Sequence, residues 1–249
     1  MSIECKSRTE IEKLRRAGQL VRGLLYEIRD RVRPGVTTLE LERYTAKRLA
    51  ELGAQPAFKG YRGYPCCLCT SVNDQIVHGI PSDRRLKEGD ILSLDLGVVL
   101  DGYYGDSAIT VPVGKISQPL QRLLEVTEEA LEMAIQKARA GNHLGDISAT
   151  VQHHAEKHHY SVVREFVGHG IGRELHEEPQ IPNFGTPGHG PVLKEGMVLA
   201  IEPMVNSGGA AVRVLDDRWT AVTEDGGYSA HFEHMVAVTR NGPDVLTRL

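Results

Sequence analysis

The stretch ILSLDLGVVLDGYYGDSAITV, residues 91–111, decides the fold because it has the pattern of a β-hairpin. Two runs rich in Ile, Leu, Val and Tyr flank Asp101-Gly102, a dipeptide that suits the positive φ angles of a two-residue turn. Such a turn joins antiparallel strands and sets their register. We therefore expect a hairpin whose pairing is determined by this turn.

The predicted register brings two carboxylates together. A two-residue turn places Gly97 opposite Asp106, which makes Asp95 the diagonal neighbour of Asp106, with Cα atoms roughly 7–8 Å apart. Because side chains alternate along a strand, Asp95, Gly97 and Asp106 share one face and the leucines of the first strand share the other. Two anions this close require a proton or a cation between them, and small Gly97 is expected to leave room for a cation. A three-residue turn would separate the two acids.

The composition is that of an ordinary globular protein. The chain has 249 residues, 41% hydrophobic and 25% charged, enough for one large domain or two small ones. A net charge of -4 gives no general attraction for phosphate backbones, so nucleic acid is not an expected substrate. The sequence has no run of about 18 apolar residues and no apolar amino-terminal segment, so we expect a cytoplasmic protein without a membrane span.

The cysteines do not form a recognisable framework. Their positions suit neither disulfide pairing nor a zinc ribbon, and we expect reduced thiols at Cys5, Cys66, Cys67 and Cys69.

Helical periodicity surrounds the hairpin. Thr9 is the expected cap of a helix that continues to Val32. Thr37 and Glu40 make a capping box for a second helix, which is expected to stop at Gly53. These signals predict a pair of helices before the hairpin.

Two further segments complete the pattern around the hairpin. Residues 117–140 are expected to form another helix, ended by Gly141. Residues 56–70 are expected to be a loop, and they hold three aromatic side chains of an aromatic-poor chain. These aromatic side chains and several other apolar residues could belong either to the hydrophobic core or to the wall of a pocket: Phe58, Tyr61, Tyr64, Cys69, Met204 and Trp219.

The second half repeats the pattern of the first. Residues 195–202, EGMVLAIE, match residues 88–95, EGDILSLD. A repeat of this length suggests two similar halves of a single catalytic domain, about 1–115 and 116–249, related by a pseudo-two-fold axis.

The repeat predicts that four carboxylates converge. It places Glu202 opposite Asp95, and Glu233, in the alternating run SAHFEHMVAV, would return beside Glu202 as Asp106 does beside Asp95. Four acids require about +4 of charge, which two divalent cations supply. His169, flanked by glycines in VGHGIG, is the best-placed imidazole to complete the set.

Such a donor set indicates a particular chemistry. An oxygen-rich site with one imidazole suits Mn, Fe, Co or Zn, and two such ions roughly 3.5–4 Å apart can activate one water. The sequence therefore favours a hydrolase.

Plainer roles remain open for each of these residues. A single strand acid is usually solvated, and a lone His169 is typical of a hydrogen-bonded loop. The glycine-rich segment could suggest phosphate binding, but it lacks the G-x-G-x-x-G spacing and the strand before it is poor. A rival metal site is HHAEKHH, residues 153–159, where His154 and His158 lie at i and i+4 on a helix. The zincin pattern needs Glu directly after the first His, so we expect a solvated helix face there.

These segments resemble those of the type I methionine aminopeptidases of peptidase family M24, subfamily A, in the short bacterial form, over nearly the whole chain. In LSLDLG, GYYGDSA, VGHGIG, AIEPM and SAHFEHM, the matching positions for the metal ligands of that family are Asp95, Asp106, His169, Glu202 and Glu233. The resemblance implies that Asp106 and Glu233 bridge two ions, with Asp95 on one ion and His169 and Glu202 on the other. It also implies an α/β (α+β) pita-bread fold, with internal pseudo-two-fold symmetry and an antiparallel central sheet flanked by helices.

The resemblance assigns further roles. His78 and His176 match the two histidines that contact substrate, and Glu202 is the expected proton shuttle. The matching positions of the methionine side-chain pocket are Tyr61, Tyr64, Cys69, Met204 and Trp219. Leu175 and Phe58 also border it and depart from residues common in bacterial relatives, Phe and Cys. Carbonyl groups near Asn73, Gln75 and Ser229 match a monovalent cation site of some members.

The activity implied is that of a methionyl aminopeptidase. Such an enzyme removes the initiator methionine of nascent proteins when the second residue is small, by attack of a metal-bridging hydroxide on the first peptide bond. The resemblance implies two divalent ions (Co, Mn, Fe or Zn), a monomer, the ribosome as a transient partner, and no nucleic-acid substrate or membrane. Two rivals are an aminopeptidase P or prolidase-like enzyme, which would share all five ligands, and a non-catalytic binding protein, which would have lost some of them.

Overall fold

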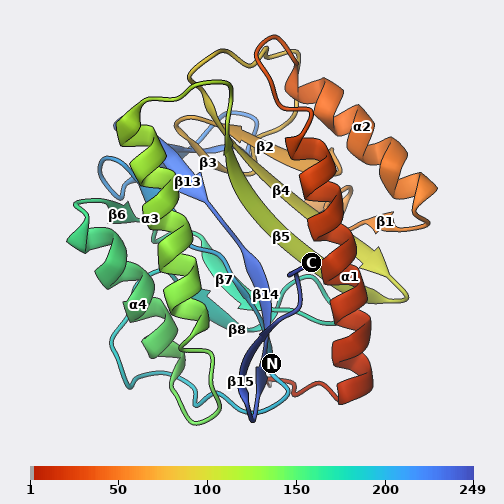
Figure 1. The fold of residues 1–249 in the computed structure, drawn as a ribbon, viewed down its shortest axis with the longest axis vertical. Coiled ribbons are helices and arrows are strands. Elements are labelled where there is room, and N and C mark those ends of the chain that lie inside the picture. Colours follow the sequence, from red (N-terminus) through yellow and green to blue (C-terminus); the bar gives the residue numbers. More distant parts are fainter. Residues whose placement is uncertain (1–2) are drawn as a thin grey trace.

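The computed structural model describes residues 3–249, with two pairs of helices on opposite sides of the strands (Figure 1). Within those residues the α-helices are α1 (Arg8–Arg29), α2 (Thr38–Glu51), α3 (Gln118–Ile135) and α4 (Leu144–Lys157). A short 3-10 helix, η1, covers Tyr61–Gly63. None of the helices between residues 3 and 249 combines the length and the apolar character needed to cross a membrane.

The strands of the described chain are mostly short. Those before α3 are β1 (Gln55–Pro56), β2 (Leu68–Val72), β3 (Gln75–Val77), β4 (Ile91–Leu100) and β5 (Tyr103–Pro112). Those after α4 are β6 (Ser161–Val162), β7 (Val167–Gly170), β8 (Glu177–Pro182), β9 (Val198–Ile201), β10 (Met204–Asn206), β11 (Val212–Val214), β12 (Ala221–Thr223), β13 (Ser229–His231), β14 (His234–Thr239) and β15 (Gly242–Val245).

The strands form antiparallel sheets. One sheet has the order β1-β4-β2, with β5 paired to β4, and the largest has the order β15-β14-β9-β7-β8. Two smaller sheets have the orders β13-β10-β6 and β11-β12-β3. In Figure 1 β4, β5 and β14 run between α1 on one side and α3 on the other, so the hairpin and the second-half strands meet in the middle of the molecule.

The structure confirms the predicted hairpin. Leu100 pairs with Tyr103 and Gly97 with Asp106 across a two-residue turn. Asp101 has a φ of 51° and the glycine after it a φ of 76°, the left-handed backbone that this turn requires. The register that places two acids on one face is therefore present.

The ends of the first helix differ from the prediction. Ser7, not Thr9, caps α1: the backbone N–H of Glu10 donates to the Ser7 hydroxyl, and the Glu10 carboxylate accepts from the Ser7 N–H. The prediction missed this because Ser7 with Glu10 is itself a capping box two residues earlier. The helix ends at Arg29 instead of continuing to Val32.

The other helix predictions have mixed outcomes. The capping box of Thr37 and Glu40 is confirmed, and Gly53 follows α2 with a φ of 67°. The third helix ends at Ile135, earlier than the predicted 140, because the backbone then tightens into turns, with the Lys137 N–H donating to the Ala134 carbonyl.

Part of the predicted loop 56–70 is strand, and His169, for which a loop was the alternative, also lies in a strand. The predicted loop 56–70 ends in β2, which pairs with β4 from Leu68 onward. The buried carboxylate of Glu42 accepts from the backbone N–H groups of Cys67 and Leu68 and so anchors the start of β2. His169 lies within β7 and pairs with Ala200 of β9. A Cβ at Gly168 would lie 2.4 Å from the Ala200 carbonyl oxygen, so glycine lets these strands approach closely.

The core lies between α1 and the hairpin and continues under α3. The buried side of α1, with Leu14, Val21 and Leu25, faces β5 and β4. Helix and strand approach closely, since a Cβ at Gly105 would lie 2.5 Å from the backbone of Ala17. This packing leaves the acidic face of the hairpin turned away from α1, towards the strands of the second half.

Candidate metal centre

Strands from both halves deliver the five predicted ligands to one place. Asp95 lies in β4 and Asp106 in β5, His169 lies in β7, Glu202 follows β9 directly, and Glu233 directly precedes β14. Several hydrogen bonds join the halves here. The Glu233 N–H donates to the Ala108 carbonyl over 2.9 Å, and the Ser107 hydroxyl donates to the Glu233 carbonyl over 2.9 Å.

All five side chains line one cavity of about 300 Å³. The remaining side chains that line it include all of the predicted substrate-binding residues: Phe58, Tyr61, Arg62, Tyr64, Cys69, Val77, His78, Glu165, Phe166, Val167, Leu175, His176, Met204 and Trp219. One end of the cavity is therefore acidic, and the rest is largely aromatic and apolar.

His169 presents one nitrogen to the acids. Its Nδ1 lies 2.9 Å from the Gly170 carbonyl oxygen, so Nδ1 bears the hydrogen and Nε2 keeps its lone pair. Nε2 lies 3.6 Å from Oε1 of Glu202 and 3.9 Å from Oδ2 of Asp106. Ligand atoms of Asp106, His169 and Glu233 all lie within 4.8 Å of one another. This arrangement suits a cation among the three groups.

The carboxylate oxygens of the cavity lack partners. Oδ1 of Asp95, Oδ1 of Asp106 and Oε1 of Glu233 are buried with no hydrogen-bond partner among residues 3–249. Burial raises the pKa of Asp95 to about 7 and that of Glu202 to about 8. Burial and neighbouring acids raise the pKa values of Asp106 and Glu233 well above their ordinary values. Four buried acids at one place do not all ionise unless positive charge balances them. The donor set therefore fits bound divalent ions.

The expected role of Gly97 is wrong. A Cβ at Gly97 would lie 2.5 Å from Cε1 of Phe58 and 2.9 Å from the Ala57 Cβ. The space beside Gly97 therefore holds the Phe58 ring and leaves no room for a cation there. The absence of a side chain at Gly97 lets the Phe58 ring pack against the hairpin as part of the apolar wall of the cavity.

Two histidines flank the acids on the substrate side. Nδ1 of His176 lies 2.8 Å from the Tyr61 hydroxyl, and the His176 ring centroid lies 4.3 Å from that of His169. Burial lowers the pKa of His176 to about 4 and that of His78 to about 4, so both rings are neutral at pH 7. In the tautomer that accepts the Tyr61 hydroxyl hydrogen at Nδ1, His176 carries its own hydrogen on Nε2 and can donate it.

The apolar set forms a cavity wall. Tyr64 and Trp219 meet edge to face with centroids 5.2 Å apart, and the His78 ring lies 6.1 Å from Trp219. The Tyr64 hydroxyl donates to the Gly79 carbonyl over 3.1 Å, which fixes the ring. Cys69 is buried in the same wall. Cys5, Cys66, Cys67 and Cys69 are not joined by disulfides in the structure.

The proposed monovalent cation residues lie near β3 and β13. The Asn73 carbonyl accepts from the Ser229 N–H over 2.9 Å, and Asn73 has a φ of 60°. Gln75 accepts from the Val72 N–H through its Oε1. Asn73 and Ser229 are thus in contact, while a role for these residues and Gln75 in holding a cation stays a prediction.

His231 was missed by the sequence analysis. Its Nε2 lies 3.2 Å from Oε2 of Glu202, the ring is buried, and neither ring nitrogen has a hydrogen-bond partner among residues 3–249. Its position two residues before Glu233 in an alternating run was the available signal, since both then point to one face. Phe166 and Arg62 also line the cavity, and no pattern in the sequence marks them.

The rival histidines lie elsewhere. His154 and His158 are absent from the cavity lining and instead meet Glu129 of α3 on the helical side of the molecule. They take no part in this centre.

Comparisons with known proteins identify the family of the chain. The model of metallopeptidase family M24 matches residues 12–240. The methionine aminopeptidase 1 of Bacillus subtilis is 51% identical over 99% of this chain and 100% of its own length. The crystal structure of the methionine aminopeptidase of Thermotoga maritima has a TM-score of 0.98 and 48% identity, with 100% of both chains covered.

More distant structures share the fold. The prolidase of Pyrococcus horikoshii has a TM-score of 0.80 and 23% identity, covering 98% of this chain and 63% of its own. Methionine aminopeptidases and prolidases both have the pita-bread fold, and the present chain shares it, as the sequence resemblance implied.

Proposed function

The chain belongs to metallopeptidase family M24, with methionine aminopeptidases as its high-identity relatives, and from this premise we propose that its cavity removes the amino-terminal methionine of new polypeptide chains. The observation on which this rests is the convergence of four carboxyl groups and one imidazole at the end of an apolar cavity. Acids and imidazole suit a hydrolytic metal centre, and the apolar wall suits a thioether side chain.

Five residues are proposed to hold two divalent ions. Asp95, Asp106 and Glu233 would hold one ion, and Asp106 and Glu233 would bridge to the second, which His169 and Glu202 complete. The unpartnered oxygens of Asp95, Asp106 and Glu233 are the structural reason for this assignment. The donor set suits Co, Mn, Fe or Zn. When bound, such ions supply an activated water and polarise the carbonyl of the first peptide bond.

Glu202 is the proposed proton shuttle. Its burial and its position between His169 and His231 support this role, in which the carboxylate would take a proton from water and deliver it to the departing amine. His169, fixed by its Nδ1 hydrogen bond to Gly170, keeps its lone pair available as a ligand throughout.

Two neutral histidines are proposed to act on the peptide itself. His176 donates from Nε2 to the oxygen that gains negative charge, because Tyr61 occupies its Nδ1. His78, held between the Phe166 and Trp219 rings, contacts the scissile amide. Both would stabilise charge that grows towards the transition state.

His231 is proposed as a positioning residue. Its Nε2 lies 3.2 Å from Oε2 of Glu202, so a small turn of the ring would align an Nε2 hydrogen on that oxygen, while the other oxygen faces His169. Imidazoles and carboxylates behind metal ligands commonly orient them in this way.

The methionine side chain is proposed to enter the apolar wall. Tyr64 and Trp219 offer ring faces and edges to a flexible, polarizable thioether. The other proposed wall residues are Phe58, Tyr61, Cys69, Leu175 and Met204. Crowding beyond this wall is expected to restrict the second residue of the substrate to small side chains.

Three wider expectations accompany this function. We infer a monomer in the cytoplasm, made of two similar halves, 1–115 and 116–249, within one catalytic domain. The proposed partners are amino-terminal methionine peptides of nascent chains and, transiently, the ribosome. A monovalent cation near Asn73, Gln75 and Ser229 would stabilise the loop between β2 and β3.

A chelation experiment tests the proposed activity. The protein is stripped of metal, and hydrolysis of the peptide Met-Ala-Ser is measured after Mn, Fe, Co and Zn are added back singly. We expect no activity after chelation and recovery with at least one ion. Absence of hydrolysis with every ion would contradict the proposal.

A second peptide separates the rival enzyme. An aminopeptidase P or prolidase-like activity would cleave an Xaa-Pro peptide and leave Met-Ala-Ser intact. The thioether-sized wall favours the methionine substrate, so we expect the opposite pattern.

A further inference from the structure

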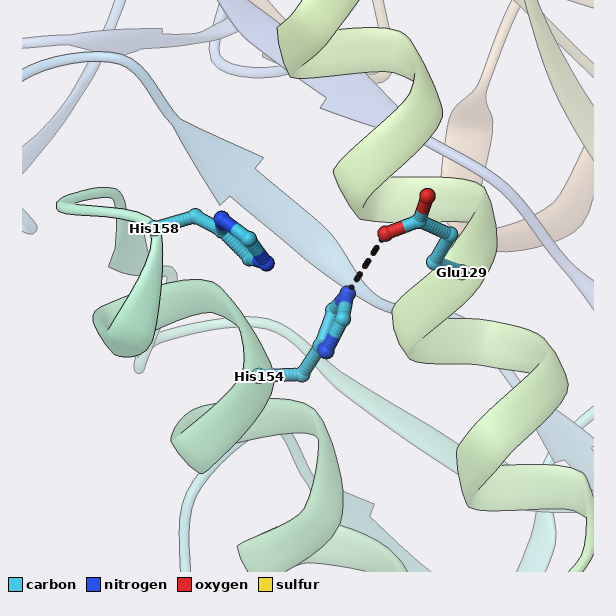
Figure 2. A group of neighbouring side chains, drawn as sticks. All are labelled: Glu129, His154 and His158. Carbon is cyan, nitrogen blue, oxygen red and sulfur yellow. Dashed lines mark hydrogen bonds and ion pairs between the residues drawn. The ribbon is translucent and has the colours of Figure 1, made fainter.

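A second group of metal-binding side chains lies on the helical side of the molecule. Glu129 comes from α3, His154 from the last turn of α4, and His158 from the residue that caps α4. Figure 2 shows the two imidazoles of α4 and the carboxylate of α3 turned towards a common space between the helices. None of the three lines the catalytic cavity.

The three side chains are already close together. Nε2 of His154 lies 2.9 Å from Oε2 of Glu129, and the two imidazole centroids lie 4.9 Å apart. Ligand atoms of the three residues all lie within 4.8 Å of one another. A tetrahedral zinc ion with bonds of roughly 2.0–2.2 Å needs donors about 3.3–3.5 Å apart. Small rotations of these side chains would supply that spacing.

The backbone favours this arrangement. Residues four apart on a helix present side chains on one face, which brings His154 and His158 together. The pair lies at the carboxyl end of α4, where the last backbone carbonyls carry partial negative charge that attracts cations. Glu129 adds a formal negative charge from the neighbouring helix.

A cation from the chain itself already contacts this group. Nη1 of Arg122 lies 3.3 Å from Oε1 of Glu129, and Nη2 lies 3.4 Å from Nε2 of His158. The Arg122 side chain is 40% exposed and also contacts Glu125, so the guanidinium can turn aside while it keeps a carboxylate partner. A small dication would replace it among the same donors.

We propose that Glu129, His154 and His158 form a surface site for one divalent cation of the zinc class, distinct from the catalytic centre. Two imidazole nitrogens with one carboxylate suit Zn²⁺, Ni²⁺ and Cu²⁺ and disfavour Mg²⁺ and Ca²⁺, which prefer oxygen donors alone. The bound ion links α3 to α4 and leaves a coordination position for water. Because the site requires both helices in place, zinc binding stabilises the folded chain.

Equilibrium dialysis against Zn²⁺ tests the site. The wild-type protein is compared with the double variant His154→Gln/His158→Gln, and His153→Gln on the same helix is the matched control. We expect the double variant to lose one equivalent of zinc and the control to lose none. Peptide hydrolysis by the double variant should equal that of the wild type, since these residues lie outside the catalytic cavity.

A charge variant sharpens the test. Arg122→Gln removes the competing guanidinium and should lower the dissociation constant for zinc at this site. Crystals soaked in zinc should show an anomalous scattering peak between Glu129, His154 and His158. The proposal would be overturned if the double variant bound as many zinc ions per chain as the wild type, or if the soaked ion did not contact His158. Both results are independent of peptide hydrolysis at the catalytic centre.

Discussion

His231 and Glu202 illustrate how single side chains determine the site. Nε2 of His231 lies 3.2 Å from one oxygen of Glu202, while His169 faces the other oxygen at 3.6 Å. Neither His231 nitrogen has a hydrogen-bond partner among residues 3–249. A carboxylate with an imidazole on each side has little freedom to rotate, which keeps it ready to bind a cation.

The role of His231 can be measured without activity. His231→Leu removes the donor and should weaken Mn²⁺ binding to the metal-free protein by roughly 10–100-fold, the usual loss for a residue that orients a ligand. His231→Gln keeps a donor and should retain more of the affinity. Isothermal titration calorimetry gives both constants, and equal affinity in the leucine variant would refute the positioning role.

For Gly97 the predicted strand pairing is confirmed, but the predicted role is wrong. The sequence predicted its position opposite Asp106 but not the Phe58 ring beside it, because Phe58 reaches the hairpin from a separate segment. Gly97→Ala inserts a methyl group 2.5 Å from that ring, and such overpacking should lower the free energy of unfolding by about 1–3 kcal/mol.

The matched control for this change is Gly23→Ala in α1. A Cβ there meets nothing within 4 Å, so the helix should gain slightly in stability from alanine. Urea denaturation of both variants checks the prediction. Equal stability of the two variants would show that the Phe58 contact is loose.

At the scale of elements, local signals predicted the hairpin and the second helix well. Asp101-Gly102 and the Thr37 capping box act within a few residues of the structures that they determine. The start of α1 was missed although Ser7 and Glu10 carry the same signal as Thr37 and Glu40. The sequence of β7 has a weak strand pattern because two of its residues are glycines. These glycines let β7 pair closely with β9 and β8, and that reason is visible only once the neighbouring strands are in place.

The cap of α1 makes stability depend on pH. Backbone and hydroxyl hydrogen bonds from Ser7 lower the pKa of Glu10 from its ordinary value of 4.5 to about 2. The folded state therefore gains stability above pH 4.5 and loses that gain as the pH falls towards 2. Glu10→Gln should cost about 1 kcal/mol at pH 7 and progressively less below about pH 4.5.

Chemical denaturation at several pH values checks this prediction. Glu12→Gln is the control, since the Glu12 side chain is 65% exposed, pairs among residues 3–249 only with Arg15 at the surface and takes no part in the cap of the same helix. The control should show little change at any pH. A constant difference between wild type and Glu10→Gln from about pH 7 to about pH 2 would contradict the assigned cause.

At the scale of the whole molecule, the sequence could predict that the acids of the two halves meet, but not which other residues line their cavity. The repeat of residues 88–95 at residues 195–202 was enough to place Glu202 with the hairpin acids in one cavity. Phe166 and Arg62 come from segments without periodicity, and only the assembled fold brings them to the same cavity. The histidines of α4 meet Glu129 because α3 packs against α4, which no local pattern specified.

The most direct test of the account is anomalous diffraction from crystals soaked in Mn²⁺. We predict two peaks roughly 3.5–4 Å apart, both in contact with Asp106 and Glu233, with His169 and Glu202 beside one of them and Asp95 beside the other. A cavity without any peak, or manganese bound only outside these five residues, would contradict the claim that the acids meet in order to hold cations.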